Sequence, residues 1–361
     1  MGVFTRPKIL TDLKNKSISM IPDRFDFTRL ASKRLNRPII SGLQQELRRA
    51  IEEVASASSE YAILDFPNHA NIGDSAIYAG EAKLCREYFN SGPLLVTETS
   101  EDDIERVAKL DEDVVLFLHG GGNFGDLYDI HQNFRNKVLT LFANHKIVLL
   151  PQSIHFENFE NVQSTKEVID RHPDFTMMVR DKFSLDFAKN NFDCKVLLVP
   201  DMAFALGPLA STVIPDLKIL GLMREDKEAK AIDKDALEQL AAPNEILDWP
   251  REEWEKSPLN RLPRNIRAYL PPSMQKLKPV SPRAFEWLAN KRVQVGLDIL
   301  ARGEVVLTDR LHAHILSILL GLPHVALDNS YGKIKRYSDL WTRGGGFSKA
   351  TNLDEACSLL K

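Results

Sequence analysis

The sequence predicts an α/β protein built on parallel, doubly wound β-sheets. Short apolar runs alternate with amphipathic segments, and this alternation occurs in two separate series. The 361-residue chain also exceeds the usual size of a single hydrophobic core. Because alternating strands and helices are typical of parallel sheets covered by helices on both faces, we expect two domains with one sheet each.

The first series contains short runs rich in Val, Ile, Leu and Phe, as expected for buried strands. The segments between them repeat apolar residues every three or four positions, which indicates helices. The predicted strands are 61–66, 93–99, 113–120, 146–154, 175–180 and 195–201, and the predicted helices are 73–89, 127–145, 165–172 and 181–191.

The second series is shorter and predicts a second, smaller sheet. Its strands are 217–226, 304–309 and 323–329, and its helices are 283–303 and 310–322, with a Pro-rich insertion at about 227–281. The predicted domains are a helical lead-in (1–59, with a helix at 42–58), an N-terminal Rossmann-like domain (60–210) and a C-terminal Rossmann-like domain (211–361), with the boundary within 207–215.

The composition is that of an ordinary soluble protein. Hydrophobic residues make up 43% of the chain and the net charge is -3, so we expect no general attraction to polyanions and no nucleic-acid partner. Cys85, Cys194 and Cys357 lie far apart, which argues for a reducing compartment and against a disulfide framework or a zinc site. There is neither a secretory leader nor an apolar run of roughly 18 residues, so we expect a cytoplasmic protein.

The segment Thr308 to Lys333, TDRLHAHILSILLGLPHVALDNSYGK, opens an apolar helix with charged residues. Asp309 suits the N-cap, which places Arg310 and His312 in the first turn, where backbone amides already favour an anion. An Arg there is unfavourable unless an anion binds. Residues two apart diverge on a helix, so we expect at most one of His312 and His314 to touch the ligand.

A polar turn follows the first predicted strand, where ligands of parallel sheets usually bind. It contains Asn68, Asn71, Gly73 and Asp74. Asp74 is either a simple N-cap or a group that faces a substrate, and the sequence leaves both readings open.

A glycine-rich segment, LHGGGNFGD (118–126), follows the third predicted strand. Its glycines fit neither the dinucleotide fingerprint nor a P-loop, but their amides could form an anion-binding nest. The candidates from this segment and from the next strand end are His119, Gly120, Gly121, Gly122, Asn123, Asp126, Gln152, Ser153 and His155.

Three arginines, Arg180, Arg224 and Arg310, end or follow predicted strands. The rigid guanidinium fork matches carboxylates and phosphates, so these arginines could converge on one anionic ligand. A structural ion pair between Arg180 and Asp181 is an equal alternative.

Together, NIGD (71–74), LHGGGNFGD, RDxxS (180–184), PDMAF (200–204) and residues 309–333 resemble the polysaccharide pyruvyl transferase family, over roughly residues 60–340. Members of that family resemble GT-B glycosyltransferases, in which two Rossmann-like domains face a cleft. They transfer pyruvate from phosphoenolpyruvate to a sugar as a ketal.

The resemblance implies a phosphoenolpyruvate site around Arg310, Leu311 and His312, with Arg180 or Arg224 as the second arginine. Lys333 is a further candidate cation, and Asn71, Gly73, Gly120 to Gly122 and Asn123 are candidate substrate contacts. Ketal formation needs an acid and a base. We expect His312 to be the acid and Asp74 the base, with His155 as the alternative for either role.

We expect neither cofactor nor metal, because arginines can neutralise the donor. The expected products are phosphate and a pyruvate ketal on a sugar of a polysaccharide or of its lipid-linked precursor. Two alternatives stay open. One is a GT-B-type glycosyltransferase that uses a nucleotide sugar, and the other is a non-catalytic sugar-binding protein, which would not need Arg310, His312 and the glycine turn together.

The run from Lys256 to Arg283 carries seven Lys or Arg and no acidic residue. It is either a solvated loop or a basic surface that approaches the inner face of the membrane or the pyrophosphate of a lipid-linked sugar.

Overall fold

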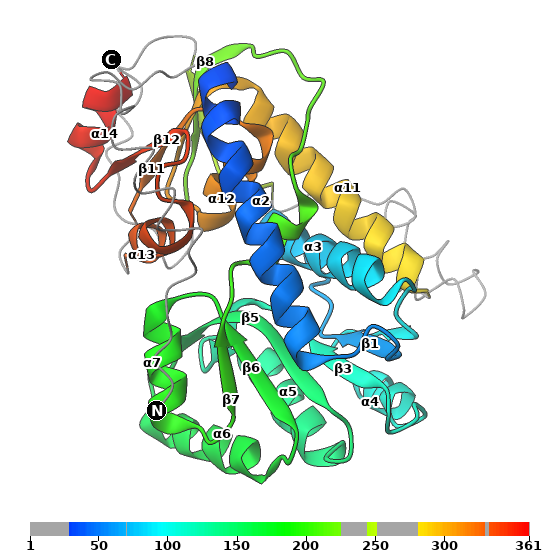
Figure 1. Cartoon of the computed structure of the whole chain (residues 1–361). Helices are drawn as coiled ribbons and strands as arrows, with labels where there is room; N and C mark the ends of the chain where they lie inside the picture. The colour runs from blue at the N-terminus through cyan, green and yellow to red at the C-terminus, as the bar shows by residue number, and fades with distance from the viewer. Residues whose placement is uncertain (1–28, 70, 225–243, 251–280, 329–331, 361) are drawn as a thin grey trace, which may run out of the picture.

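A computed structural model describes residues 29–69, 71–224, 244–250, 281–328 and 332–360 of the chain (Figure 1). The described chain contains two β-sheets in which every paired strand is parallel. Helices pack around both sheets, so the predicted α/β class with Rossmann-like parallel sheets is confirmed.

The first sheet has the order β2-β1-β3-β5-β6-β7, and β4 pairs with β5. Strands β1, β3 and β6 are buried along their whole length, which explains their uninterrupted apolar sequences. The strands are β1 (Tyr61–Leu64), β2 (Leu95–Val96), β3 (Val115–Leu118), β4 (Gly121–Gly125), β5 (Ile147–His155), β6 (Phe175–Val179) and β7 (Lys195–Leu198). All six predicted strands are present, whereas the glycine-rich β4 was not predicted.

The helices of this half follow their strands closely, as in other parallel sheets. They are α3 (Ile72–Phe89), α4 (Glu101–Val107), α5 (Asp129–Leu141), α6 (Phe159–Arg171), α7 (Lys182–Asn191) and the short 3-10 helix η1 (Met202–Leu206).

The second sheet has the order β12-β11-β10-β8-β9. Its strands are β8 (Leu217–Leu222), β9 (Asn244–Leu247), β10 (Gly303–Thr308), β11 (His324–Leu327) and β12 (Phe347–Ala350), and its helices and turns are α11 (Pro282–Ala301), α12 (Leu311–Leu320), α13 (Lys333–Tyr337), η2 (Ser338–Thr342) and α14 (Leu353–Leu360). Strands β9 and β12 were not predicted. Strand β9 lies inside the predicted insertion, so that segment is not purely an insertion. Residues 225–243 and 251–280, and with them most of the basic run, lie outside the described residues.

Both sheets share one winding pattern. In each, the first strand lies between the second and the third, so the direction of winding reverses between β1 and β3 and again between β8 and β10. Open parallel sheets bind ligands at such reversal points, beyond the carboxyl ends of the strands. The topology therefore marks two places for a site, one in each sheet.

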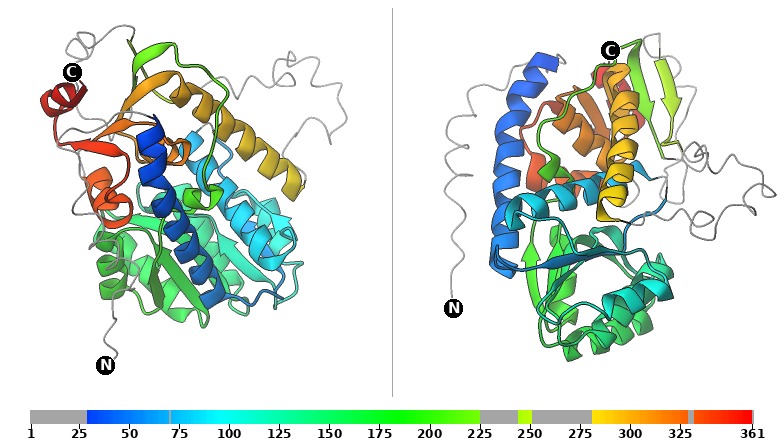
Figure 2. Two further views of the ribbon diagram at one scale, coloured as in Figure 1. Left: turned by 45° about the horizontal axis from the view of Figure 1, so that its top comes forward. Right: turned by 90° about the vertical axis from the view of Figure 1, so that its right-hand side faces the viewer.

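Helix α2 (Arg29–Val54) crosses both halves of the molecule, as Figures 1 and 2 show. Arg29 donates to the carbonyls of Ala301 and Gly303, near the second sheet, whereas Gln44 Nε2 donates to the carbonyl of Ala205. The sequence predicted a helix only from residue 42. The earlier start was missed because Pro38, which is inside the helix, suggests a break.

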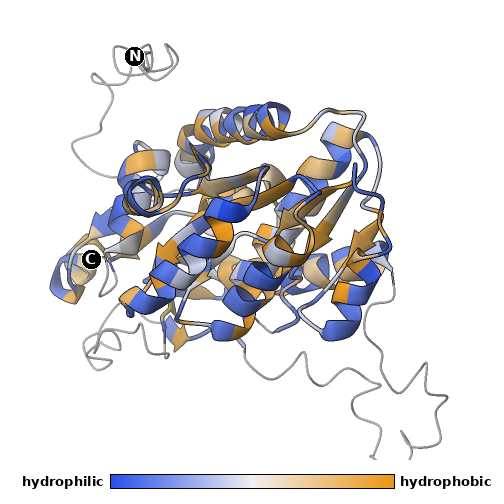
Figure 3. Ribbon diagram, turned by 90° about the horizontal axis from the view of Figure 1, so that it is seen from below, coloured by the Kyte–Doolittle hydropathy of each residue, from blue (hydrophilic) through white to orange (hydrophobic). Residues whose placement is uncertain are grey.

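One apolar cluster joins the two halves. It includes buried residues of α2, α3, α11 and α12. A Cβ placed on Gly296 of α11 would lie only 2.5 Å from Ile72 of α3, which shows how closely these two helices pack. Figure 3 shows the apolar residues gathered on the strands and on the inner sides of the helices. The predicted boundary at 207–215 falls between β7 and β8, and the predicted domain limits themselves stay a prediction.

The packing of α3 on η1 predicts opposite effects for two helical Gly→Ala changes. A Cβ on Gly80 would lie 1.9 Å from the carbonyl oxygen of Met202, whereas a Cβ on Gly42 of α2 would meet nothing within 4 Å. We expect Gly80→Ala to destabilise the protein by roughly 1–3 kcal/mol through overpacking. Gly42→Ala should stabilise it by up to about 1 kcal/mol through helix propensity. Thermal and urea unfolding followed by circular dichroism measure both, and equal stability of the two variants would contradict this account of the packing.

Candidate functional site

The start of α12 follows β10 and meets the start of α3. Arg310 is the N-cap residue of α12, with φ -100° and ψ 123°, so the helix begins one residue later than predicted. A Cβ on Gly73 would lie 2.3 Å from Nδ1 of His312. Only a glycine therefore allows this imidazole to rest against the first turn of α3.

Asp309 is not the helix cap that the sequence predicted. Its Oδ1 accepts a hydrogen bond from the backbone amide of Arg224, at 2.8 Å, and so ties the end of β8 to the end of β10. Burial raises the pKa of this carboxyl. The two histidines of α12 diverge as expected, because His314 is fully buried and hydrogen-bonded to His324 and Thr342.

Asp201 connects His312 with Arg180. It follows β7, and its Oδ2 lies 2.5 Å from Nη1 of Arg180 and 3.4 Å from Nε2 of His312, the latter being long for a hydrogen bond. Burial alone would raise the pKa of Asp201, but His312 and Arg180 outweigh it and hold the pKa well below its usual range. Asp201 is therefore an ionised carboxylate between the guanidinium of Arg180 and the imidazole of His312. The alternative ion pair of Arg180 with Asp181 is not formed, since Asp181 caps α7 through Ser184.

The C-terminal half also holds this cluster from the other side. The hydroxyl oxygen of Tyr337 accepts a hydrogen bond from the amide of Asp201, and the indole of Trp341 donates to the carbonyl of Arg180. Both aromatic residues belong to α13 and η2. The two halves of the chain therefore build the site together.

Arg310 forms a largely buried ion pair with Asp248, just after β9. Asp248 lies in the segment that was predicted to be an insertion, at about 227–281, and no sequence motif indicated this residue. Leu311 is partly buried against the apolar core, and Arg224 is half-buried at the end of β8. Lys333 begins α13, but its side chain lies outside the described part of the structure.

The start of α3 faces the glycine-rich segment. Asn71 is the N-cap of α3 and accepts from the amide of Gly73 at 2.9 Å, so Asp74 does not serve as the cap. Asp74 Oδ1 lies 3.8 Å from the position of a Cβ on Gly121, and Asp74 Oδ2 lies 3.5 Å from Nε2 of His69. The carboxylate is thus directed at the reversal point of the first sheet.

The predicted glycine nest is only partly available to a ligand. The amide of Gly120 donates to the buried Oε1 of Glu81, at 2.8 Å, and Gly121 has a positive φ of 127° and begins β4. Gly122 leaves room for Arg180, because a Cβ there would lie 3.0 Å from Nη2 of that side chain. Asp126 binds the turn that precedes α6 instead of facing the site, since it accepts from the amides of Glu157 and Asn158.

Asn123 belongs to a buried network that the sequence did not reveal. Its side-chain oxygen accepts from Arg135 at 2.6 Å and from Gln152 at 3.0 Å. Arg135 also binds Asp65 at 2.9 Å, and Asp65 binds Nδ1 of His131 at 2.6 Å. No sequence signal indicated His131 and Asp65, because Asp65 is about 70 positions away along the chain from His131 and Arg135, which bind it.

His155 lies farther along β5 than the other candidates. It pairs with Gly125, whereas Gln152 of the same strand pairs with Gly121 at the reversal point. Its Nε2 lies 3.7 Å from Glu157. Ser153 lies closer to the cluster, because its hydroxyl accepts from Nε of Arg180 at 2.9 Å.

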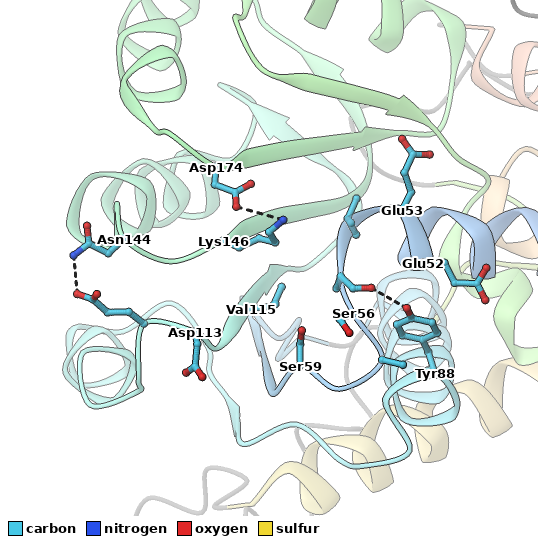
Figure 4. Close-up of a pocket in the computed structure, with 14 residues that line it drawn as sticks. Glu52, Glu53, Ser56, Ser59, Tyr88, Asp113, Val115, Asn144, Lys146 and Asp174 are labelled. Atoms are coloured by element: carbon cyan, nitrogen blue, oxygen red, sulfur yellow. Dashed lines mark hydrogen bonds and ion pairs between the residues drawn. The ribbon is translucent and has the colours of Figure 1, made fainter.

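A surface depression of 680 Å³ lies at the opposite edge of the first sheet (Figure 4). It is bordered by residues at or just before the amino ends of strands, Val115, Lys146 and Asp174, and by the end of α2. Four further acidic residues line it, and Lys146 pairs with Asp174 at 3.3 Å. An anionic ligand would be repelled there, so this depression does not compete with the cluster around His312.

None of the helices in the described ranges is both long enough and apolar enough to cross a membrane.

The buried pair of His119 and Glu81 predicts a pH dependence of stability. Their side chains lie 2.8 Å apart. Burial lowers the pKa of His119, but Glu81 outweighs it, so that the pKa is raised above 6.5. A raised pKa stabilises the fold below the unfolded value of about 6.5, and this contribution is lost as the pH rises through the folded pKa.

We therefore expect the melting temperature of the wild type to fall as the pH rises above about 6.5, and Glu81→Gln to remove most of that fall. The other shifted imidazoles, His69, His172, His314 and His324, have lowered pKa values and titrate below this window. Parallel melting curves of the two proteins against pH measure it, and an unchanged slope in Glu81→Gln would refute the assignment.

Comparison with known proteins agrees with the motifs. The family model described as polysaccharide pyruvyl transferase matches residues 71–331. The chain is 34% identical over 308 residues to "Putative pyruvyl transferase EpsO" of Bacillus subtilis, with 84% of this chain and 91% of that protein covered. It is 33% identical over 323 residues to "Pyruvyl transferase 1" of Schizosaccharomyces pombe, with 83% and 75% covered.

A crystal structure of a functionally uncharacterized protein from Klebsiella pneumoniae has the same fold. It superposes with a TM-score of 0.57 at 20% sequence identity, and the match covers 86% of this chain and 98% of that one. The family model covers well over half of the chain, and both named relatives match most of it. The chain belongs to the polysaccharide pyruvyl transferase family.

Proposed function

We propose that this protein transfers pyruvate from phosphoenolpyruvate to a saccharide, forms a ketal with two sugar hydroxyls and releases phosphate. One observation carries the proposal. His312 lies against the start of α3 and next to the ion pair of Asp201 and Arg180. An acid, a cation and the amino ends of two helices therefore meet where the two halves of the chain meet.

The donor needs cations and amide donors rather than apolar surface. Phosphoenolpyruvate carries a carboxylate and a phosphate on a small frame, and arginine suits both groups. Arg310 and Arg180 are the proposed cations, with the amides at the start of α12 completing the anion site. Arg180 is preferred over Arg224 as the second arginine because it shares Asp201 with His312. Arg224 and Lys333 are secondary candidates.

Two protein carboxylates already bind these arginines, Asp248 to Arg310 and Asp201 to Arg180. Each guanidinium has five N–H donors, so one carboxylate does not exhaust it. The donor would bind both guanidinium groups beside these carboxylates. In this arrangement the aspartates fix the forks in place and lower the entropy lost when the donor binds.

The proposed acid lies at the start of α12 and the proposed base lies at the start of α3. His312 protonates the methylene carbon C3, and Asp74 accepts the proton of the first sugar hydroxyl as its oxygen bonds to C2. The second hydroxyl then bonds to C2 while the C2–O bond to phosphate breaks. His155 is the alternative acid or base, although its position farther along β5 makes it secondary. Arginines take the place of a metal ion, and no cofactor takes part.

We propose a GT-B-like arrangement in which both reversal points face one cleft that holds the donor and the acceptor. The contact of His312 with Gly73 supports it, because these residues follow the reversal strands β10 and β1. The proposed acceptor is a polysaccharide or its lipid-linked precursor. A cytoplasmic location, with the basic run up to Arg283 approaching the inner face of the membrane, completes the proposal.

Thermal stabilisation by the donor tests the site. Phosphoenolpyruvate at about 100 times its dissociation constant should add roughly 2.7 kcal/mol of stability, which a melting curve resolves. We expect this shift with phosphoenolpyruvate but not with pyruvate, UDP or GDP, and we expect its loss in Arg310→Ala and Arg180→Ala. Lys218→Ala, which removes an exposed cation paired with Glu304, is the control and should keep the shift. A shift with a nucleoside diphosphate alone would instead favour a glycosyltransferase.

The contact of Gly73 with His312 predicts a loss of activity without a loss of fold. In Gly73→Ala the new methyl group must displace the imidazole. Misplacing a catalytic group by about 1 Å can cost on the order of 10²-fold in rate, so we expect a loss of this size in pyruvyl transfer. Gly42→Ala controls for the substitution itself, and the melting temperature reports the fold. Full activity of Gly73→Ala would show that His312 takes no part in the reaction.

A further inference from the structure

The proposed reaction needs two proton acceptors, and only one has been assigned. This inference rests on the proposed function. A ketal joins two sugar oxygens to C2, so two hydroxyls lose their protons. One of these two hydroxyl protons makes up for the proton that His312 gives to C3. The other leaves with the released phosphate. Asp74 can serve the first hydroxyl, and the second needs a base in a different place.

His131 has the contacts of a histidine that is held for proton transfer. It lies in the first turn of α5, and its Nδ1 lies 2.6 Å from Oδ1 of Asp65. Asp65 is fully buried, directly follows β1 and has a φ of 70°, which non-glycine residues seldom adopt. Such strained residues concentrate at functional sites, because the surrounding structure must hold them.

The bonding of Asp65 fixes which nitrogen of His131 carries the proton. Oδ2 of Asp65 binds Nη2 of Arg135 in a fully buried ion pair at 2.9 Å. A carboxylate in such a pair is ionised and can only accept hydrogen bonds, so Nδ1 of His131 must donate. In the neutral imidazole the lone pair is then on Nε2. This is the arrangement in which an aspartate orients a histidine as a general base.

His131 lies on the acceptor side of the proposed site. Asp65 and Asp74 both follow β1, which borders the reversal point of the first sheet. Burial is the main cause that lowers the pKa of His69, and His131 lowers it further; Nε2 of His69 in turn lies 3.5 Å from Oδ2 of Asp74. The side chain of His131 is 16% exposed, whereas Arg135 behind it is 1% exposed. The inner part of the network is therefore structural, and the imidazole is its accessible end.

We propose that His131, oriented by Asp65, is the base for the second sugar hydroxyl during ring closure. The second hydroxyl oxygen bonds to C2, the C2–O bond to phosphate breaks with its electron pair, and the hydroxyl proton passes to Nε2 of His131. The released phosphate or water then takes this proton. Atoms and charge balance, because the two hydroxyl protons end on C3 and on phosphate.

The test uses the natural acceptor without identifying it beforehand. Deleting the gene in its host yields unpyruvylated envelope saccharide, which is extracted and incubated with phosphoenolpyruvate and purified full-length protein. The measured product is the pyruvate that mild acid releases from the saccharide. We expect His131→Ala to lower this rate by about 10²- to 10⁴-fold, the usual contribution of a general base. Added imidazole should restore part of the rate.

Two further measurements separate catalysis from folding. His131→Ala should keep the melting shift with phosphoenolpyruvate, because the proposed donor site does not include it. Ile130→Ala, which removes a 63% exposed side chain from the preceding position, should match the wild type in every assay. Wild-type rates in His131→Ala, or a loss that imidazole does not restore, would overturn the inference and leave the proposed function intact. If the wild-type protein transferred no pyruvate to this saccharide, the proposed function itself would fail.

Discussion

The ionised carboxylate of Asp201 is the constraint on which the site depends. It accepts from Arg180, lies 3.4 Å from His312, and its amide binds the hydroxyl of Tyr337. Arg180 comes from the same half of the chain as Asp201, whereas His312 and Tyr337 come from the other half, so the two sheets cannot move apart without losing the contacts of Asp201 with His312 and Tyr337. We infer that this interaction fixes the relative position of the two halves and, through it, the position of His312.

Close packing serves the same purpose around Asp201. Helix α2 bridges the halves along one side, and α3 and α11 pack with almost no space between Ile72 and Gly296. Gly73 and Gly80 of α3 admit His312 and the carbonyl of Met202 at distances that exclude a side chain. The starts of α3 and α12 are therefore held together by steric fit as well as by charge, which is the preorganisation that the proposed catalytic site requires.

The sequence predicted the sheets well and the side-chain pairing poorly. Strands that are buried on both faces give uninterrupted apolar runs, so the first sheet was found with only β4 missing, whose glycines carry no hydrophobic signal. Strand β9 was missed because its residues are only partly buried. The strand ends indicated Arg180, Arg310 and His312, and the structure places Arg180 and His312 beside the same carboxylate. Their partners Asp201 and Asp248 were not selected, because an ion pair between distant segments leaves no spacing in the sequence. The same holds for Asp65 and His131.

The pairing of arginines with aspartates changes how the anion site must work. A bare arginine pair would bind any small anion, including the phosphate that the proposed reaction releases. With Asp201 bound to Arg180 and Asp248 bound to Arg310, each guanidinium is already largely neutralised, so in the proposed site either arginine alone would attract an anion less strongly. We infer that a donor carrying both a carboxylate and a phosphate would gain more from two such arginines than a ligand with one anionic group. The aspartates would thus favour the donor over the released phosphate. They would do so by weakening the binding of phosphate, not by attracting the donor more strongly.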